Sequence, residues 1–377
     1  MAVFVHDGDR CLWRLDLDEP GAEPQRLTAP EADGRFAGAL GGGVIDAGRH
    51  RWIGVLETGD RDQLVAVPLT GGPPEALHQA LDFCGYPALS ACGSRLAWVE
   101  WQQPCLPWER SQLWLAAVGR DGALASPRAV AGSSPGDATG LSVFQPLWAG
   151  ADLVVANDRS GFWNLERWVG AAAAEIPGER QGGAVTTAPP WQPLLPMAAE
   201  FAMPQWVFGM ATTAWDGERL LAMACAKGRW QLGEVVLAPA PHWQPLAQPC
   251  DDLAALTAEA GRLACVASGP ALPAGLLELE LASGSWTHTP AAPCPLAPEA
   301  ISVPEELWFD GHGGQPTQAW YYPPAGGGHA EAPLLVKSHS GPTAMARTGL
   351  SLGIQFWTCR GWGVVDVNYG GSTGFGR

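Results

Sequence analysis

The sequence predicts a mainly β protein, a β-propeller followed by the first strand, helix and strand of a parallel α/β domain. A strand-rich repeat of about 50 residues runs through the first three quarters of the chain and predicts the propeller. The last quarter loses this repeat and shows long apolar runs on either side of a helical pattern. The 48 glycines and 34 prolines are scattered, which favours many short strands over long helices. At 377 residues the chain is also longer than one hydrophobic core usually organises.

The repeat consists of two apolar strands joined by a short connection. A strand-like run that starts with a leucine recurs, at Leu12, Leu64, Leu113, Leu165, Leu232 and Leu276, and in four of the six runs a second leucine lies five residues farther on. Apolar strand-like runs precede the later ones, at 51–57, 95–101, 152–158, 219–225 and 262–268. Such pairs are typical of four-stranded propeller blades. The first unit lacks most of what should precede it, so we expect the first blade to be incomplete.

The last quarter follows a proline-rich join at 288–300. A hairpin centred on "HGGQP" comes first, then a continuous apolar strand at 332–339 of the kind buried on both faces. Residues 346–363 are expected to form a helix, and 363–369 a second buried strand. Strand, helix and strand in this order predict two parallel strands joined by a right-handed crossover.

Charge and cysteine usage exclude several functional classes. The formal net charge of −16 argues against binding nucleic acid or an anionic membrane, because both require clustered Lys and Arg. We find no secretory signal pattern and no apolar run long enough to span a membrane. Nine dispersed cysteines without a C-x-x-C pair indicate reduced thiols in a cytoplasmic protein. None of the eight histidines has metal-ligand spacing, so we expect no metal and no cofactor. The oligomeric state stays open.

Several segments resemble the prolyl oligopeptidase family of serine peptidases, closest to its acylaminoacyl-peptidase and dipeptidyl-aminopeptidase-like branch. The segments are "YPALSACGSRLAWVEW", "NDRSGFWNL", "ISVPEELWFDG", "PLLVKSHSGPT" and "IQFWTCRGWGVVDVNYGGSTGFGR". The resemblance implies a β-propeller over residues 1–298, with its first blade incomplete. It also implies that residues 299–377 are the start of an α/β-hydrolase peptidase domain, itself incomplete.

The motif "GGSTG" at 370–374 fits the G-x-S-x-G pattern of hydrolase nucleophiles, which makes Ser372 a candidate. In that fold the nucleophile is followed by an acid and a histidine, yet only residues 373–377 follow Ser372. No general base for Ser372 can be identified from the sequence. The resemblance implies that Asn368, Tyr369 and Ser372 instead belong to a structural and substrate-side loop, with the catalytic triad expected beyond residue 377.

The resemblance also implies half of an oxyanion hole. Family members carry H-G-G-P where this chain has His339, Ser340, Gly341 and Pro342. The backbone N–H of Gly341 corresponds to a donor for the tetrahedral intermediate, which can contribute roughly 3 kcal/mol of transition-state stabilisation. Ser340 replaces a glycine, and a positive φ there would cost about 1 kcal/mol. The alternative interpretation is a plain Gly-Pro turn after a strand.

Glu200 has two interpretations. It could lie near the mouth of the propeller and bind the amino terminus of a substrate, as acidic residues do in some family members. This chain lacks a Glu-Glu pair at a matching place, since Glu305 and Glu306 lie at the domain join. We therefore favour an ordinary solvated residue.

The resemblance implies a serine peptidase that hydrolyses short peptides, of acylaminoacyl or dipeptidyl type, through a Ser-His-Asp triad. Residues 1–377 would contribute the propeller and one oxyanion donor, and alone they are predicted to be inactive. The alternative is a non-catalytic β-propeller that serves as a binding scaffold, with residues 301–377 a degenerate remnant. An open reading frame past codon 377 would support the peptidase, and a natural stop codon there the scaffold.

Overall fold

The computed structural model describes residues 1–59, 61–173, 191–327, 330–341 and 343–377. The chain forms two compact units, whose residues alternate along the sequence between 157 and 210. Unit 1 comprises residues 1–157, 166–192 and 205–209, and unit 2 comprises residues 158–165, 193–204 and 210–377. The predicted boundary between residues 298 and 299 stays a prediction.

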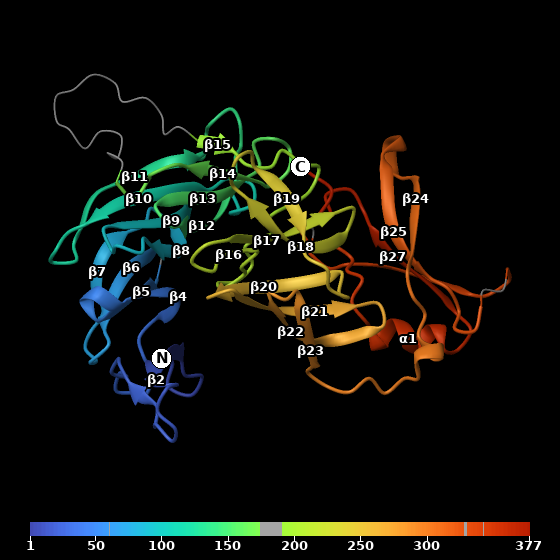
Figure 1. The fold of residues 1–377 in the computed structure, drawn as a ribbon, viewed down its shortest axis with the longest axis horizontal. Coiled ribbons are helices and arrows are strands. Elements are labelled where there is room, and N and C mark those ends of the chain that lie inside the picture. Colours follow the sequence, from blue (N-terminus) through green and yellow to red (C-terminus); the bar gives the residue numbers. More distant parts are fainter. Residues whose placement is uncertain (60, 174–190, 328–329, 342) are drawn as a thin grey trace. The chain divides into compact units, whose positions relative to one another are not determined.

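The sheets of the first half are antiparallel and follow one another in chain order (Figure 1). A three-stranded sheet, β1-β2-β3, comes first and four-stranded sheets follow. The strands are β1 (Ala2–Val5), β2 (Leu12–Leu15), β3 (Gln25–Arg26), β4 (Ala39–Asp46), β5 (Arg51–Thr58), β6 (Arg61–Pro68), β7 (Glu75–Gln79), β8 (Phe83–Leu89), β9 (Arg95–Trp101), β10 (Gln112–Val118), β11 (Leu124–Gly132), β12 (Val143–Ala149), β13 (Asp152–Asn157), β14 (Asn164–Trp168) and β15 (Trp191–Pro193).

The middle strands of these sheets supply the core. Ile53 on β5 and Leu64 on β6 are fully buried, as are Trp98 on β9 and Leu113 on β10. These middle strands are packed on both faces, so their sequences are the most apolar. The apolar pairs found in the sequence are these middle strands, and their prediction is confirmed.

The first strand of each of three sheets carries a bulge at a matching position. The pairing register shifts between Gly41 and Val44, between Gly85 and Ala88, and between Phe144 and Leu147. Within these gaps Gly42, Tyr86 and Gln145 have φ values of 57°, 57° and 41°. A bulge bends and twists the strand that contains it. The three sheets therefore share a bend in their first strand as well as the two apolar middle strands.

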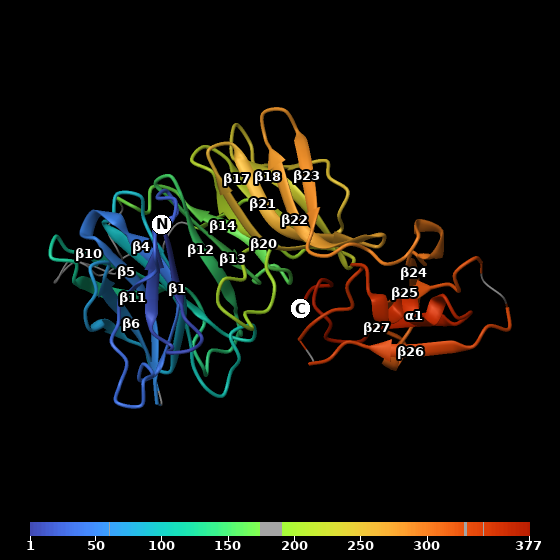
Figure 2. The same cartoon turned by 90° about the horizontal axis from the view of Figure 1, so that it is seen from below.

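Unit 2 contains two more four-stranded antiparallel sheets and one mixed sheet (Figures 1 and 2). Met223 and Leu253 lie in one buried cluster that joins the two antiparallel sheets. The strands are β16 (Thr213–Trp215), β17 (Leu220–Ala226), β18 (Arg229–Val236), β19 (His242–Pro245), β20 (Asp252–Glu259), β21 (Arg262–Gly269), β22 (Leu272–Glu280), β23 (Ser285–Pro290), β24 (Glu305–Asp310), β25 (Pro316–Tyr322), β26 (Leu334–Ser338) and β27 (Gly363–Asn368).

The mixed sheet has the order β24-β25-β27-β26, and only its β26 and β27 pair is parallel. The register runs from Leu334 opposite Gly363 to Ser338 opposite Val367. Helix α1 (Leu352–Thr358) connects the two strands and packs beside β27 (Figure 2). The predicted hairpin and the predicted parallel strand, helix and strand are both confirmed. The expected burial of the first parallel strand on both faces is wrong, because β26 is the edge strand of the sheet and most of its residues are exposed.

Helix α1 is shorter than the sequence pattern predicted. It begins after Ser351, whose hydroxyl accepts from the backbone N–H of Ile354. The preceding residues are held elsewhere: the Arg347 guanidinium pairs with Asp252, and the Leu350 N–H donates to a backbone carbonyl at the end of β21. Among the described residues, no helix has the length and apolar character needed to cross a membrane.

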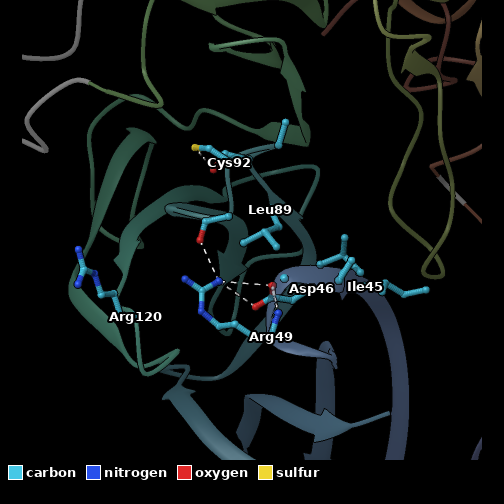
Figure 3. A pocket seen from close by; sticks show the side chains of 12 residues that line it. Ile45, Asp46, Arg49, Leu89, Cys92 and Arg120 are labelled. Carbon is cyan, nitrogen blue, oxygen red and sulfur yellow. Dashed lines mark hydrogen bonds and ion pairs between the residues drawn. The ribbon is translucent and has the colours of Figure 1, made fainter.

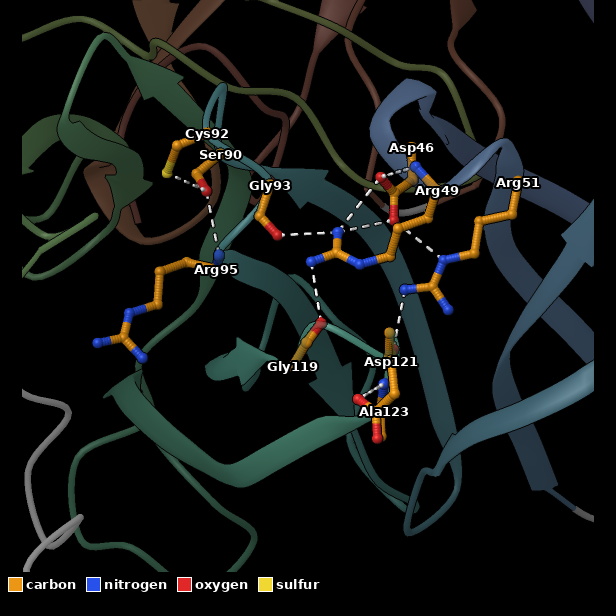
Figure 4. A network of polar contacts seen from close by, with 11 residues as sticks. Asp46, Arg49, Arg51, Ser90, Cys92, Gly93, Arg95, Gly119, Asp121 and Ala123 are labelled. Carbon is orange, nitrogen blue, oxygen red and sulfur yellow. Dashed lines mark hydrogen bonds and ion pairs between the residues drawn. The ribbon is translucent and has the colours of Figure 1, made fainter.

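Adjacent sheets of unit 1 are joined by a buried ionic network (Figure 4). Asp46 is 1% exposed and pairs with Arg51 at 3.0 Å and Arg49 at 3.1 Å. Arg49 donates onward to the Gly93 carbonyl in the turn between β8 and β9, at 3.1 Å. Arg51 donates to the Gly122 carbonyl between β10 and β11, at 2.8 Å. One buried carboxylate therefore orients two guanidinium groups that hold turns of the neighbouring sheet.

Candidate active site

The loop after β26 and the loop after β27 lie side by side in unit 2. The two strands are parallel neighbours, so their carboxyl ends meet at the same edge of the sheet. This arrangement brings residues 339–341 beside residues 368–372. Pro342, also predicted for this site, lies outside the described residues.

A histidine and a serine face each other between these loops. His339 Nε2 lies 2.7 Å from Ser372 Oγ, and that hydroxyl lies 2.7 Å from the Tyr369 carbonyl oxygen. The Ser372 hydroxyl has one proton and donates it to the carbonyl, so His339 donates through Nε2. The sequence identified no base for Ser372, and the histidine that the structure places beside it donates to the hydroxyl instead of accepting its proton.

This pairing does not make Ser372 an activated nucleophile. Nucleophilic activation requires the histidine to accept the serine proton while a third group orients its other nitrogen. The contacts of His339 Nδ1 are the Tyr369 hydroxyl at 3.3 Å and the Ser340 carbonyl at 3.2 Å, neither of them a carboxylate. Ser372 is also only 5% exposed. The geometry favours a loop-fixing role for Ser372.

Gly341 adopts a backbone conformation that glycine reaches more easily than other residues. Its φ is 81°, in the left-handed region, and it is exposed at the edge of the loop. Ser340 does not have a positive φ, so the strain considered for a serine at that position is absent. The Tyr369 hydroxyl donates to the Gly341 carbonyl at 3.0 Å. The predicted oxyanion donor is therefore held in one conformation at an accessible place.

Asn368 fixes the far end of the same loop. Its side-chain oxygen accepts from the Ala346 N–H at 2.6 Å, and its amide nitrogen donates to Gln318 on β25 at 2.5 Å. Both side chains are buried. Asn368 is thus a structural member of the predicted set, and its hydrogen bonds run into the sheet.

Glu200 is not a solvated residue, so our interpretation of it was wrong. It is 6% exposed, and its carboxylate accepts from the Trp163 N–H at 2.6 Å and the Gly376 N–H at 3.2 Å. Burial raises its pKa to about 7, and the charge of Asp158 adds to the rise, while the two N–H donors act against it. Arg377 lies next to Gly376 and pairs with Asp158 at 2.8 Å. Glu200 therefore ties residues 158–163 to the last residues of the chain, all within unit 2.

A pocket in unit 1 was not anticipated from the sequence (Figure 3). Its volume is about 460 Å³, and Arg49, Cys92 and Arg120 are among the residues that line it. Hydrogen bonds from Ser90 and Ser94 lower the pKa of the exposed Cys92 thiol to about 7. Arg49 is committed to the ionic network described above. Over the residues that the structure describes, no group of three or more His, Cys, Asp or Glu side chains could hold a metal ion.

No protein-family model matches the chain, and no curated protein does. Several solved structures are similar to the chain. A puromycin-hydrolyzing peptidase from Mycobacterium tuberculosis is 32% identical with a TM-score of 0.85, covering 100% of this chain and 56% of that one. Puromycin hydrolase, also solved as a serine-to-alanine mutant complexed with PGG, is 30% identical with a TM-score of 0.84, covering 100% and 57%.

More distant structures share the fold alone. A prolyl endopeptidase is 14% identical with a TM-score of 0.61, covering 100% of this chain and 53% of that one. Prolyl oligopeptidase B from Galerina marginata is 11% identical with a TM-score of 0.72, covering 98% and 51%. In each comparison the chain spans little more than half the length of the solved protein.

Proposed function

Because the chain belongs to the prolyl oligopeptidase family, we propose that it is part of a serine peptidase that hydrolyses short peptides by acyl transfer. The observation that carries this proposal is the 32% identity to a puromycin-hydrolyzing peptidase over the whole chain, with a TM-score of 0.85. We further propose acylaminoacyl or dipeptidyl substrates, with puromycin as the first test compound. The four-stranded sheets would form a propeller that admits short peptides and excludes folded proteins.

Within this proposal, residues 339–341 supply one donor of the oxyanion hole. The Gly341 N–H would stabilise the negative oxygen of the tetrahedral intermediate, an interaction worth roughly 3 kcal/mol when the donor is preorganised. The proposed nucleophile, acid and histidine lie beyond residue 377. The solved relatives support this placement, since the chain covers 56% of the first of them.

The experiment compares the longer protein encoded by an open frame past codon 377 with residues 1–377. We expect the longer protein to react with a fluorophosphonate probe and to hydrolyse puromycin or a chromogenic dipeptide, and the shorter chain to do neither. A serine-to-alanine change in the downstream G-x-S-x-G motif should abolish both reactions. A stop codon at 378, or a longer protein without activity on any of these substrates, would favour the non-catalytic binding scaffold.

A further inference from the structure

The conformation of Gly341 needs an anchor outside the glycine itself. A glycine reaches a φ of 81° without steric cost, but for the same reason it has no steric preference for that value over its alternatives. Gly341 is exposed, so packing does not select a conformation either. A hydrogen bond to a neighbouring peptide group can therefore limit the directions that its N–H takes.

The Tyr369 hydroxyl is the side-chain donor on this glycine. It donates to the Gly341 carbonyl at 3.0 Å, and its other oxygen and nitrogen neighbours, the His339 carbonyl and ring Nδ1, lie farther away at 3.4 and 3.3 Å. A phenol has one proton, so the shortest of these contacts takes it. The Gly341 carbonyl is thereby bound by a residue that lies 28 positions farther along the chain.

Tyr369 is itself held by a closed circuit of contacts. Its ring stacks on the His339 ring with centroids 4.3 Å apart and an interplanar angle of 17°. His339 reaches Ser372 through Nε2 at 2.7 Å, and the Ser372 hydroxyl and N–H both donate to the Tyr369 carbonyl, at 2.7 and 2.9 Å. Each member of the circuit restricts the next, so the phenol hydroxyl has little freedom to leave Gly341.

Resting on the proposed function, we propose that Tyr369 is a positioning residue of the oxyanion hole, acting through the Gly341 carbonyl to fix the Gly341 N–H for the transition state. His339 and Ser372 hold Tyr369 in place and take no part in proton transfer. The hydrogen bond explains why a tyrosine follows the second parallel strand.

The test is Tyr369→Phe in the longer protein, which removes the hydroxyl and keeps the ring stacked on His339. Tyr321→Phe, on the half-buried tyrosine of β25, is the matched control. Because a misplaced donor is felt only in the transition state, we expect Tyr369→Phe to lower kcat by roughly 10- to 100-fold, with KM changed less than about twofold. The inhibition constant of a peptide boronate, which forms a tetrahedral adduct, should rise by a similar factor, while that of the peptide product stays constant. The control should retain full activity.

A second measurement separates this inference from the proposed function. The chain has four Ser-Gly pairs, beginning at Ser160, Ser268, Ser283 and Ser340, so labelling serine carbonyls with ¹³C and glycine amides with ¹⁵N leaves few amide signals. In residues 1–377, Tyr369→Phe should shift or broaden the Gly341 amide signal, and Tyr321→Phe should not. If the longer protein hydrolyses nothing, the proposed function fails, and this signal still decides whether Tyr369 anchors the loop. An unchanged signal, an unchanged kcat, or an equal loss of affinity for boronate and product would overturn the inference.

Discussion

The buried carboxyl of Glu200 should make part of unit 2 lose stability as the pH rises. Its pKa is raised from 4.5 to about 7, mainly by burial, so the native state holds this proton more tightly than the unfolded chain does. The free energy of unfolding therefore falls with increasing pH between about 4.5 and 7 and is constant on either side. Each pKa unit corresponds to about 1.4 kcal/mol, so the whole effect is about 3 kcal/mol.

Glu200→Gln isolates this contribution, because glutamine keeps the shape of the side chain and cannot ionise. The Trp163 and Gly376 donors bond to different oxygens of Glu200, so one of them would face the NH2 group of glutamine, but that loss does not depend on pH. Acidic groups that do not interact with Glu200 titrate alike in both proteins, so their contribution cancels in the comparison.

The assay is amide hydrogen exchange of residues 158–165 and 370–377 at pH 5, 6, 7 and 8, corrected for intrinsic exchange rates. Between pH 5 and 8 the opening free energy of the wild type should fall by about 2.5 kcal/mol relative to Glu200→Gln, since the part of the effect below pH 5 lies outside this range. Parallel pH profiles for the two proteins would refute the reasoning, because they would show that Glu200 titrates alike in the folded and unfolded chains.

Three further predictions follow from named residues. Asp46→Ala leaves the buried Arg51 and the part-buried Arg49 without their carboxylate and should cost about 3 to 5 kcal/mol in urea unfolding, whereas Asp7→Ala at an exposed site should be neutral. Val336 is 65% exposed on the edge strand β26, so residues 1–377 should self-associate more than residues 1–298, and Val336→Lys should reduce this in sedimentation velocity. Ser372→Ala should leave fluorophosphonate labelling of residues 1–377 absent, as in the wild type, and should retain activity in the longer protein within about tenfold. Labelling that depends on Ser372 would contradict the donor role assigned to His339.

The candidate site could be located from the sequence, although its contacts could not. The motifs after two apolar strands place His339, Gly341 and Tyr369 at one sheet edge, because parallel neighbouring strands end together. No pattern in the sequence shows that His339 lies 2.7 Å from Ser372, 33 residues away. Such a contact depends on how two loops pack, and loops lack the hydrophobic periodicity from which structure can be predicted.

The burial and the raised pKa of Glu200 likewise could not be predicted from the sequence. A glutamate in a loop is usually solvated, and nothing in "AAEFAMPQWVFGM" marks this one as buried. Its environment comes from Trp163 and Gly376, which reach it from distant parts of the chain. Burial and pKa are therefore properties of the assembled unit and not of the local sequence.

The sequence by itself determined the repeated pairs of middle strands and β27, because strands buried on both faces must be apolar in any arrangement of their neighbours. It also located β26 by its apolar run, although this edge strand is mostly exposed. It did not reveal outer strands such as β7, whose residues are mostly exposed and so carry little pattern. Only the tertiary structure decided that the helix begins at Leu352, since Arg347 and Leu350 bond to β20 and the end of β21 instead of continuing it. Local patterns record which side chains are buried, whereas contacts between distant segments are decided by packing, which the local sequence does not encode.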